Sequence, residues 1–124
     1  MSIFTRAFNK FGGYGDLARR FPGGPEPAGQ RWERRCVEFG NTMRYDWCVT
    51  IVVAAEGLWL QARPPAQGTQ AAIFVPWAEI REARSALLYW RRAVRLTCGA
   101  PVAGTITVWQ PVWVVAEPLW QAAR

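Results

Sequence analysis

The side chains that most often carry out catalysis are scarce in this sequence of 124 residues. Histidine, the commonest general base near neutral pH, is missing altogether. The two serines, Ser2 and Ser85, lie outside any G-x-S-x-G turn, and without histidine neither can belong to a Ser-His-Asp triad. We therefore expect neither a hydrolase of the triad type nor an H-E-x-x-H metal site.

The carboxylates and thiols are weaker candidates for chemistry. Glu33 with Glu38, and Glu79 with Glu82, are close enough in sequence to form a glycosidase-type pair, but we interpret them as solvated or arginine-paired. The three cysteines form no C-x-x-C motif, which argues against a disulfide framework and a zinc site. An arginine next to Cys36 could lower its thiol pKa, although a buried structural thiol is the better interpretation. The sequence predicts a protein that is not an enzyme and that uses no cofactor or metal.

Arginine and tryptophan are the residue types that stand out. Lys and Arg together number 15 against nine Asp and Glu, Lys10 is the single lysine, and there are eight tryptophans. Guanidinium groups suit carboxylates, phosphates and aromatic faces, whereas most of the tryptophans should be core residues. Biased coding that also raises Ala, Gly and Pro is an alternative explanation for the arginines. The candidate binding surface combines both residue types: Arg34, Arg35, Arg44, Arg91, Arg95, Trp59 and Trp109.

The N-terminal segment, residues 1–29, is expected to be separate from the main domain, residues 30–124. Phe4, Phe8 and Phe11 follow helical i, i+4, i+7 spacing on a weakly basic segment, and a Pro/Gly-rich linker covers residues 22–29. The three phenylalanines could lie on a membrane surface, or dock on this domain or on a second copy. No apolar run follows the first residues, so we expect no signal peptide and a cytoplasmic location, including the inner face of the membrane.

From Gln30 onward the apolar residues alternate with period two, which predicts strands. The predicted strands are 32–39, 42–47 running directly into 48–55, 58–62, 71–75, 85–90, 93–98 and 105–109. Gly40-Asn41 and Glu56-Gly57 are hairpin turns, and Pro111 suits the start of a terminal helix. We predict a mostly β sandwich or barrel of about seven antiparallel strands, with an N-terminal helical segment and a C-terminal helix.

Strand alternation also assigns faces to the candidate surface residues. Trp59 should lie opposite Leu58 and Leu60, and Trp109 opposite Val108. Arg91 and Arg95 should both point outward if Val94 and Leu96 point inward. An outward tryptophan would mark an interface, and an outward arginine face would attract phosphate or an acidic partner.

Two short motifs carry a family resemblance. The stretch VTIVVAAEGLWL (49–60), followed by VPWAEI (75–80), resembles PH-like and GRAM-like domains of small bacterial proteins, where an EGL hairpin precedes an IPW-x-x-I turn. GDLARRFP (15–22) looks like the start of the same group. The resemblance covers roughly residues 14–123 and implies a PH-like barrel closed by the terminal helix, working as a binding module. The first hairpin loop, Gly40-Asn41, departs from the longer basic loop that would grip an inositol phosphate.

Three kinds of partner fit these features. The leading hypothesis is a non-catalytic adaptor that binds another protein or a second copy of itself. The alternative is peripheral binding to anionic lipid through the basic face and the N-terminal segment. Nucleic acid is disfavoured because the aromatic residues follow core periodicity and no RNP-like motif is present.

Overall fold

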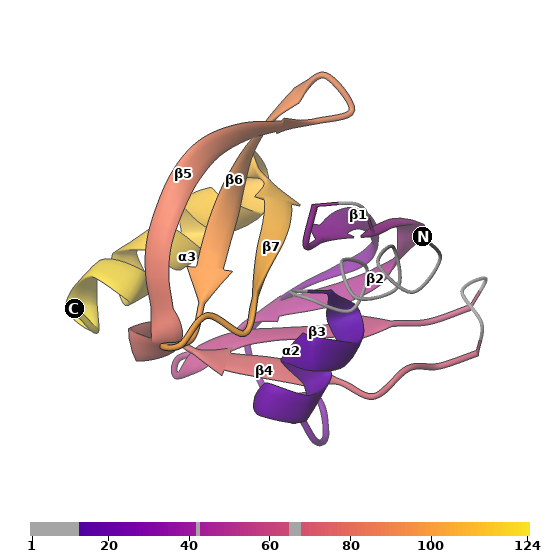
Figure 1. Cartoon of the computed structure of the whole chain (residues 1–124), viewed down its shortest axis with the longest axis horizontal. Helices are drawn as coiled ribbons and strands as arrows, with labels where there is room; N and C mark the ends of the chain where they lie inside the picture. The colour runs from indigo at the N-terminus through magenta and orange to yellow at the C-terminus, as the bar shows by residue number, and fades with distance from the viewer. Residues whose placement is uncertain (1–12, 42, 65–67) are drawn as a thin grey trace, which may run out of the picture.

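The computed structural model describes residues 13–41, 43–64 and 68–124, and this part of the chain is mostly β. Seven antiparallel strands form one sheet in the order β4-β3-β2-β1-β7-β6-β5. The strands are β1 (Gln30–Phe39), β2 (Met43–Val53), β3 (Gly57–Ala62), β4 (Ile73–Pro76), β5 (Ile80–Leu88), β6 (Arg91–Cys98) and β7 (Gly104–Trp109). The sheet curls into a half-barrel, in which β2, β3 and β4 run across the direction of β5, β6 and β7 (Figure 1).

Helical elements cover the half-barrel, as Figure 1 shows. They are α2 (Tyr14–Arg20), the short 3-10 helix η1 (Trp77–Glu79) and α3 (Gln110–Ala122). The predicted mostly β class with a helix near each end is therefore confirmed. Helix α3 starts with a proline in its first turn, and it continues through Pro118 instead of breaking there. None of the helices in the described residues is long and apolar enough to cross a bilayer.

The main core lies between the sheet and these helices. Leu17 of α2 is fully buried, and Trp77 of η1 and Trp120 of α3 belong to the same buried cluster. The indole Nε1 of Trp120 donates to the Ile80 carbonyl at 2.7 Å, so the C-terminal helix is tied to the start of β5. Because a buried indole N–H group needs a partner, this bond fixes Trp120 as well as helix α3.

Two predicted strand boundaries need correction. The strands predicted at 42–47 and 48–55 are one continuous strand, β2, which bends at a bulge instead of ending. The strand predicted at 85–90 begins earlier, at Ile80, and ends at Leu88, because Tyr89 and Trp90 form the turn into β6. Aromatic residues favour strands by propensity, so the sequence predicts Trp90 in a strand and the structure places it in the turn.

The sheet opens where β1 leaves β7. These two strands pair at only two positions, Glu38 with Thr107 and Phe39 with Ile106. Earlier in β1, its pairing with β2 contains two bulges. Between Trp32 and Arg35, two residues of β1 oppose one of β2. Between Arg35 and Val37, one residue of β1 opposes three of β2. Bulges of this kind bend a strand and re-aim its side chains. The bent pair β1–β2 therefore leaves a gap beside β7 and the start of α3.

Candidate binding site

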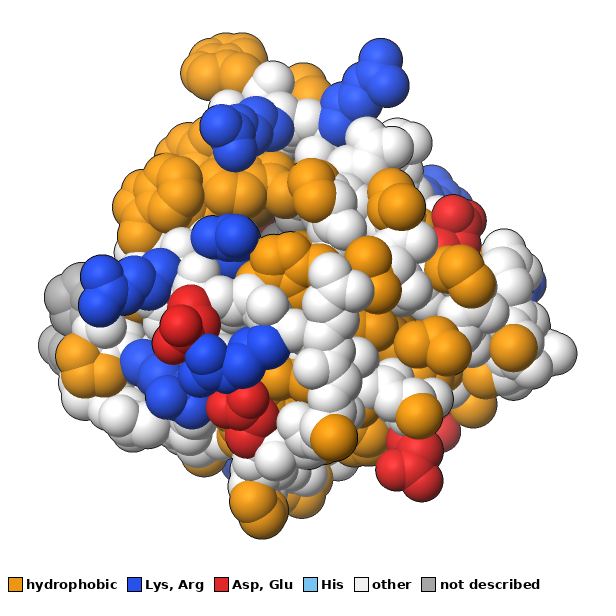
Figure 2. Space-filling model, turned by 180° about the vertical axis from the view of Figure 1, so that it is seen from behind, with side chains coloured by type: hydrophobic (Ala, Val, Ile, Leu, Met, Phe, Trp, Pro, Cys, Tyr) orange, Lys and Arg blue, Asp and Glu red, His pale blue; other side chains and the backbone are white. Residues whose placement is uncertain are grey.

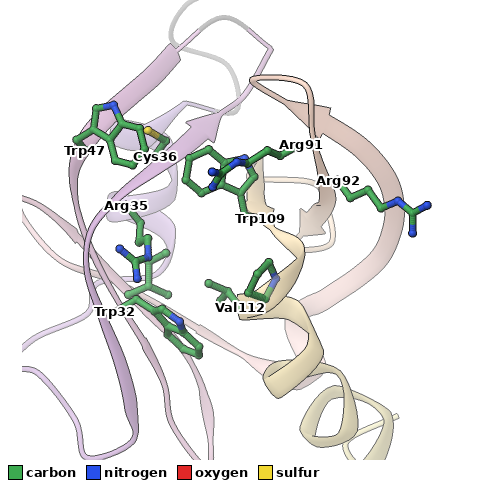
Figure 3. A pocket seen from close by; sticks show the side chains of 10 residues that line it. Trp32, Arg35, Cys36, Trp47, Arg91, Arg92, Trp109 and Val112 are labelled. Carbon is green, nitrogen blue, oxygen red and sulfur yellow. The ribbon is translucent and has the colours of Figure 1, made fainter.

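A pocket of about 320 Å³ occupies the gap between β1 and β7. Three tryptophans and three arginines line it, together with Cys36 and the start of α3: Trp32, Trp47, Trp109, Arg35, Arg91 and Arg92. In Figure 3, Trp32, Arg35 and Trp47 approach from the β1–β2 side, and Trp109 and Val112 face them from the other side. We call this space the arginine–tryptophan pocket.

Trp109 forms the wall between the pocket and a small second cluster of buried residues. This cluster lies on the face of the sheet opposite the main core and contains Cys36, Leu88, Ala93 and Trp109. The Trp109 indole donates to the Leu88 carbonyl at 2.7 Å, which fixes the ring. The Arg91 guanidinium carbon lies 4.8 Å from the centre of the Trp109 ring, and the Trp47 ring centre lies 5.5 Å from it. Trp109 is thus a rigid, cation-capped aromatic wall.

Positive charge predominates in the lining of the arginine–tryptophan pocket. No carboxylate lines it, and within the described ranges Arg35, Arg91 and Arg92 form no ion pair. Arg35 instead donates to the backbone carbonyl of Glu33 at 3.0 Å, which holds its guanidinium at the bulge of β1. Arginine stays charged at any relevant pH, so the pocket attracts an anion.

Among the described residues, four of the six exposed large apolar side chains come from β2 and from the end of the β5–β6 hairpin, beside this pocket. Trp90 is 93% exposed, Leu87 65%, Trp47 56% and Tyr89 37%. We call these four residues the aromatic tip. Leu87 lies near the end of β5, Tyr89 and Trp90 form the turn into β6, and Trp47 lies in the bulge of β2. Figure 2 shows hydrophobic side chains with Lys or Arg among them at the top of the molecule. Exposed apolar groups collected in one place mark an interaction surface.

Tyr89 ties the two parts of the aromatic tip together. Its hydroxyl donates to Asp46 Oδ1 in the β2 bulge, and the Arg44 guanidinium carbon lies 4.8 Å from its ring centre. The bond to Asp46 raises the pKa of Tyr89, because it stabilises the protonated phenol. The hairpin turn is therefore docked on β2.

Unusual backbone conformations are concentrated at the same place. In the described part of the chain, four residues other than glycine have positive φ: Arg34 at 53°, Trp47 at 58°, Tyr89 at 51° and Trp90 at 63°. Trp47, Tyr89 and Trp90 belong to the aromatic tip, and Arg34 precedes Arg35 of the pocket. A side chain in this region costs of order 1–3 kcal/mol, and two-residue hairpin turns normally use Asn-Gly to avoid that cost. Strain held at one site is typical of functional positions.

The structure brings some of the predicted surface residues together and separates others. Arg35, Arg91 and Trp109 meet in the pocket, Arg44 contacts the aromatic tip, and exposed Arg34 is next to Arg35 in the chain. Arg95 is partly buried and lies 3.8 Å from Glu38 in an ion pair, so it is not part of this group. Phe4, Phe8 and Phe11 lie outside the described residues.

Trp59 does not reach the surface where the sequence had placed it. Its side chain is 1% exposed, and its indole donates to the Gly24 carbonyl at 3.2 Å. The strand alternation is as expected, since Trp59 packs with Val52 and Ala72 away from the main core. However, the chain around Gly23 and Gly24 crosses this face and covers it.

Sequence reasoning missed the aromatic and apolar members of the site other than Trp109. Trp32, Trp47, Leu87, Tyr89 and Trp90 were not among the candidate residues. A signal was present, because two short strand patterns flank Tyr89-Trp90 at the spacing of a two-residue hairpin turn. The positive φ of Trp47 had no such signal, since it depends on the register between β1 and β2.

Two thiols have raised pKa values, and several carboxylates pair with arginines. Burial raises the pKa of the Cys36 thiol, and it raises that of Cys98 to about 12, so both are protonated at neutral pH. Glu33, Glu38 and Glu82 each pair with an arginine. Among the residues that the structure describes, no cluster of His, Cys, Asp and Glu could hold a metal ion.

Comparison with protein families, with curated proteins and with solved structures found no match to this chain. The PH-like and GRAM-like resemblance therefore stays a prediction. What the chain does has to follow from the pocket, the aromatic tip and their charges.

Proposed function

We propose that this protein is a non-catalytic binding module that contacts another protein through the aromatic tip. The observation that carries the proposal is Trp90, which is 93% exposed and sits at φ 63° in the turn between β5 and β6. Its ring adds no buried area to the fold, and its backbone conformation costs free energy. A side chain that destabilises its own domain fits a role outside that domain.

The surroundings of the aromatic tip support a protein partner with acidic groups. Tryptophan, tyrosine and arginine are the residues that most often dominate the binding free energy of protein interfaces. Arg44 and Arg91 lie against aromatic rings of the site and have no carboxylate within ion-pair distance among the described residues. A partner that supplies carboxylates would complement them and bind faster at low salt.

Self-association is a narrower form of the same proposal. A second copy of this chain also carries a formal net charge of +6, so two copies repel each other at long range. Light scattering across a concentration series decides this point. A mass that doubles with concentration would identify the partner as another copy, and a constant monomer mass would leave a different protein.

The PH-like resemblance is part of the proposal. The strand order with β1 between β2 and β7, and a C-terminal helix packed on the half-barrel, support it. A β domain of that kind holds its hairpin turns rigidly, which suits a binding surface.

Affinity capture from extract of the native cell tests the proposal. Wild-type protein is compared with Trp90→Ala, and with Arg81→Gln as a control for an exposed residue away from the site. We expect a protein that wild type and Arg81→Gln retain and that Trp90→Ala loses, and purified partner should reproduce the difference. Equal retention by Trp90→Ala would count against the aromatic tip as the binding surface.

Anionic lipid is a second candidate because the exposed Trp90 stands next to Arg91 and Arg92. Tryptophan and arginine are both favoured at the level of lipid headgroups. Vesicles containing one-third phosphatidylserine, sedimented at low and at high salt, distinguish this candidate. Salt-sensitive sedimentation that Trp90→Ala abolishes would support a peripheral role at the inner membrane face, and absence of sedimentation at low salt would end it.

A further inference from the structure

We propose that the arginine–tryptophan pocket binds a small planar anion, namely an aromatic ring that carries a carboxylate. This ligand differs from the protein partner proposed above: Trp47 and Arg91 belong to both surfaces, whereas Leu87 and Trp90 of the aromatic tip do not line the pocket. The inference rests on three properties of the pocket: its charge, its aromatic walls and its size.

The charge of the pocket selects an anion. Arg35 and Arg91 lie on opposite sides of the space, whereas Arg92 extends away from the other labelled side chains in Figure 3. In the described part of the chain, neither Arg35 nor Arg91 has a carboxylate partner. A guanidinium donates two parallel hydrogen bonds to a carboxylate, and the bond is stronger where aromatic side chains exclude water. A carboxylate would supply the counter-charge that the fold leaves out.

The walls of the pocket select a flat apolar body. Trp32 and Trp47 come from β1 and β2, and Trp109 faces them from the end of β7. The planes of Trp47 and Trp109 are inclined by 56°, so the two rings are not stacked on each other. Trp47 is 56% exposed and leaves ring surface for a ligand, whereas Trp109 is 8% exposed and forms the buried back of the wall. Ring faces gain most from planar aromatic partners that lie offset or edge-on.

The size of the pocket sets the class of ligand. A volume of about 320 Å³ lies at the lower end of the range for small-molecule sites. A bare inorganic anion would leave the tryptophan walls uncovered, and a neutral ring would leave both guanidinium groups without a counter-charge. A single aromatic ring or two fused rings bearing a carboxylate would both cover the tryptophan walls and supply the counter-charge.

Isothermal titration calorimetry with 2-naphthoate tests this proposal. 2-Naphthamide is the matched neutral probe, and inorganic phosphate is the anion without a ring. We expect saturable binding of 2-naphthoate at one site, with 2-naphthamide and phosphate each at least tenfold weaker, because charge-assisted hydrogen bonds and ring contacts each contribute about that factor. Equal binding of naphthoate and naphthamide, or no binding of naphthoate, would overturn the proposal.

Variants locate the site and separate it from the protein-binding surface. Arg35→Gln/Arg91→Gln and Trp47→Ala should each weaken 2-naphthoate at least tenfold, whereas the control Arg81→Gln/Arg84→Gln removes the same charge and should leave it unchanged. Trp90→Ala should also leave it unchanged, although it removes partner binding. An unfolding curve is recorded for each variant to check that it is folded. Naphthoate affinity that survives Arg35→Gln/Arg91→Gln, or that falls equally in the control, would refute binding in this pocket.

Discussion

Two tryptophans outside the main core differ sharply in their exposure to solvent. Trp59 on β3 is covered by the chain that crosses near Gly24, and only 1% of its surface is exposed. Trp90, in the turn between β5 and β6, is 93% exposed, and no described segment covers it. Trp59 and Trp109 are both covered on the face of the sheet away from the main core, whereas Trp90 is left exposed in its turn. Under the proposed function, this exposure leaves the aromatic tip open for a partner.

Replacing the two tryptophans by alanine should produce the largest contrast. Trp59→Ala removes a buried ring and its hydrogen bond, so we expect a loss of about 3–5 kcal/mol in the free energy of unfolding. Trp90→Ala should change it by less than about 0.5 kcal/mol. Denaturation in urea measures both values. Similar losses in the two variants would break the comparison.

Replacing the turn residues by the pair that suits the turn should stabilise the protein. Tyr89→Asn/Trp90→Gly relieves two positive-φ positions, and it also removes the Tyr89 bond to Asp46 and the Arg44 contact. We expect a net gain of about 1 kcal/mol in the free energy of unfolding, because the relief at two strained positions exceeds one exposed hydrogen bond. Urea denaturation gives the sign. A clear destabilisation would mean that the aromatic turn belongs to the fold.

The contact between Arg91 and Trp109 should contribute a smaller amount. Arg91→Gln removes the cation from the ring and should lower the free energy of unfolding by about 0.5–1 kcal/mol. Arg84 forms an exposed ion pair with Glu82, so Arg84→Gln should change it by less than about 0.5 kcal/mol. Urea denaturation at one salt concentration compares the free energies of unfolding of the two variants. A larger loss from Arg84→Gln than from Arg91→Gln would contradict this order.

Ionisation of the buried Cys98 thiol should have the smallest effect. It should change the free energy of unfolding only at alkaline pH. Burial raises the pKa of Cys98 to about 12 in the folded protein, from an ordinary value of 9.0. Stability from the protonated thiol is then complete below about pH 9 and falls as the pH rises toward 12. Cys98→Ala should show a shallower decline between pH 9 and 11 than wild type. Identical slopes in urea denaturation at these pH values would argue against the shift.

The sequence was sufficient for the fold class but only partly for the site. Period-two alternation and the Glu56-Gly57 turn predict β2 and β3, because buried strands must place apolar residues on one face. The covering of Trp59 could not be predicted, since it depends on a Pro/Gly segment that carries no pattern. The placement of Arg35 and Arg91 around one pocket depends on the bulges of β1 and β2 and on where β1 leaves β7. Both are properties of strand pairing.

Partner binding by the Tyr89→Asn/Trp90→Gly variant tests the central claim most directly. The partner identified by affinity capture is titrated, as purified protein, against wild type and this variant at equal concentration and salt. If the aromatic tip is open for binding, the variant should be folded and at least as stable as wild type, yet bind the partner at least a hundredfold more weakly. Binding equal to that of wild type would contradict the claim and leave the exposed tryptophan without a role in recognition.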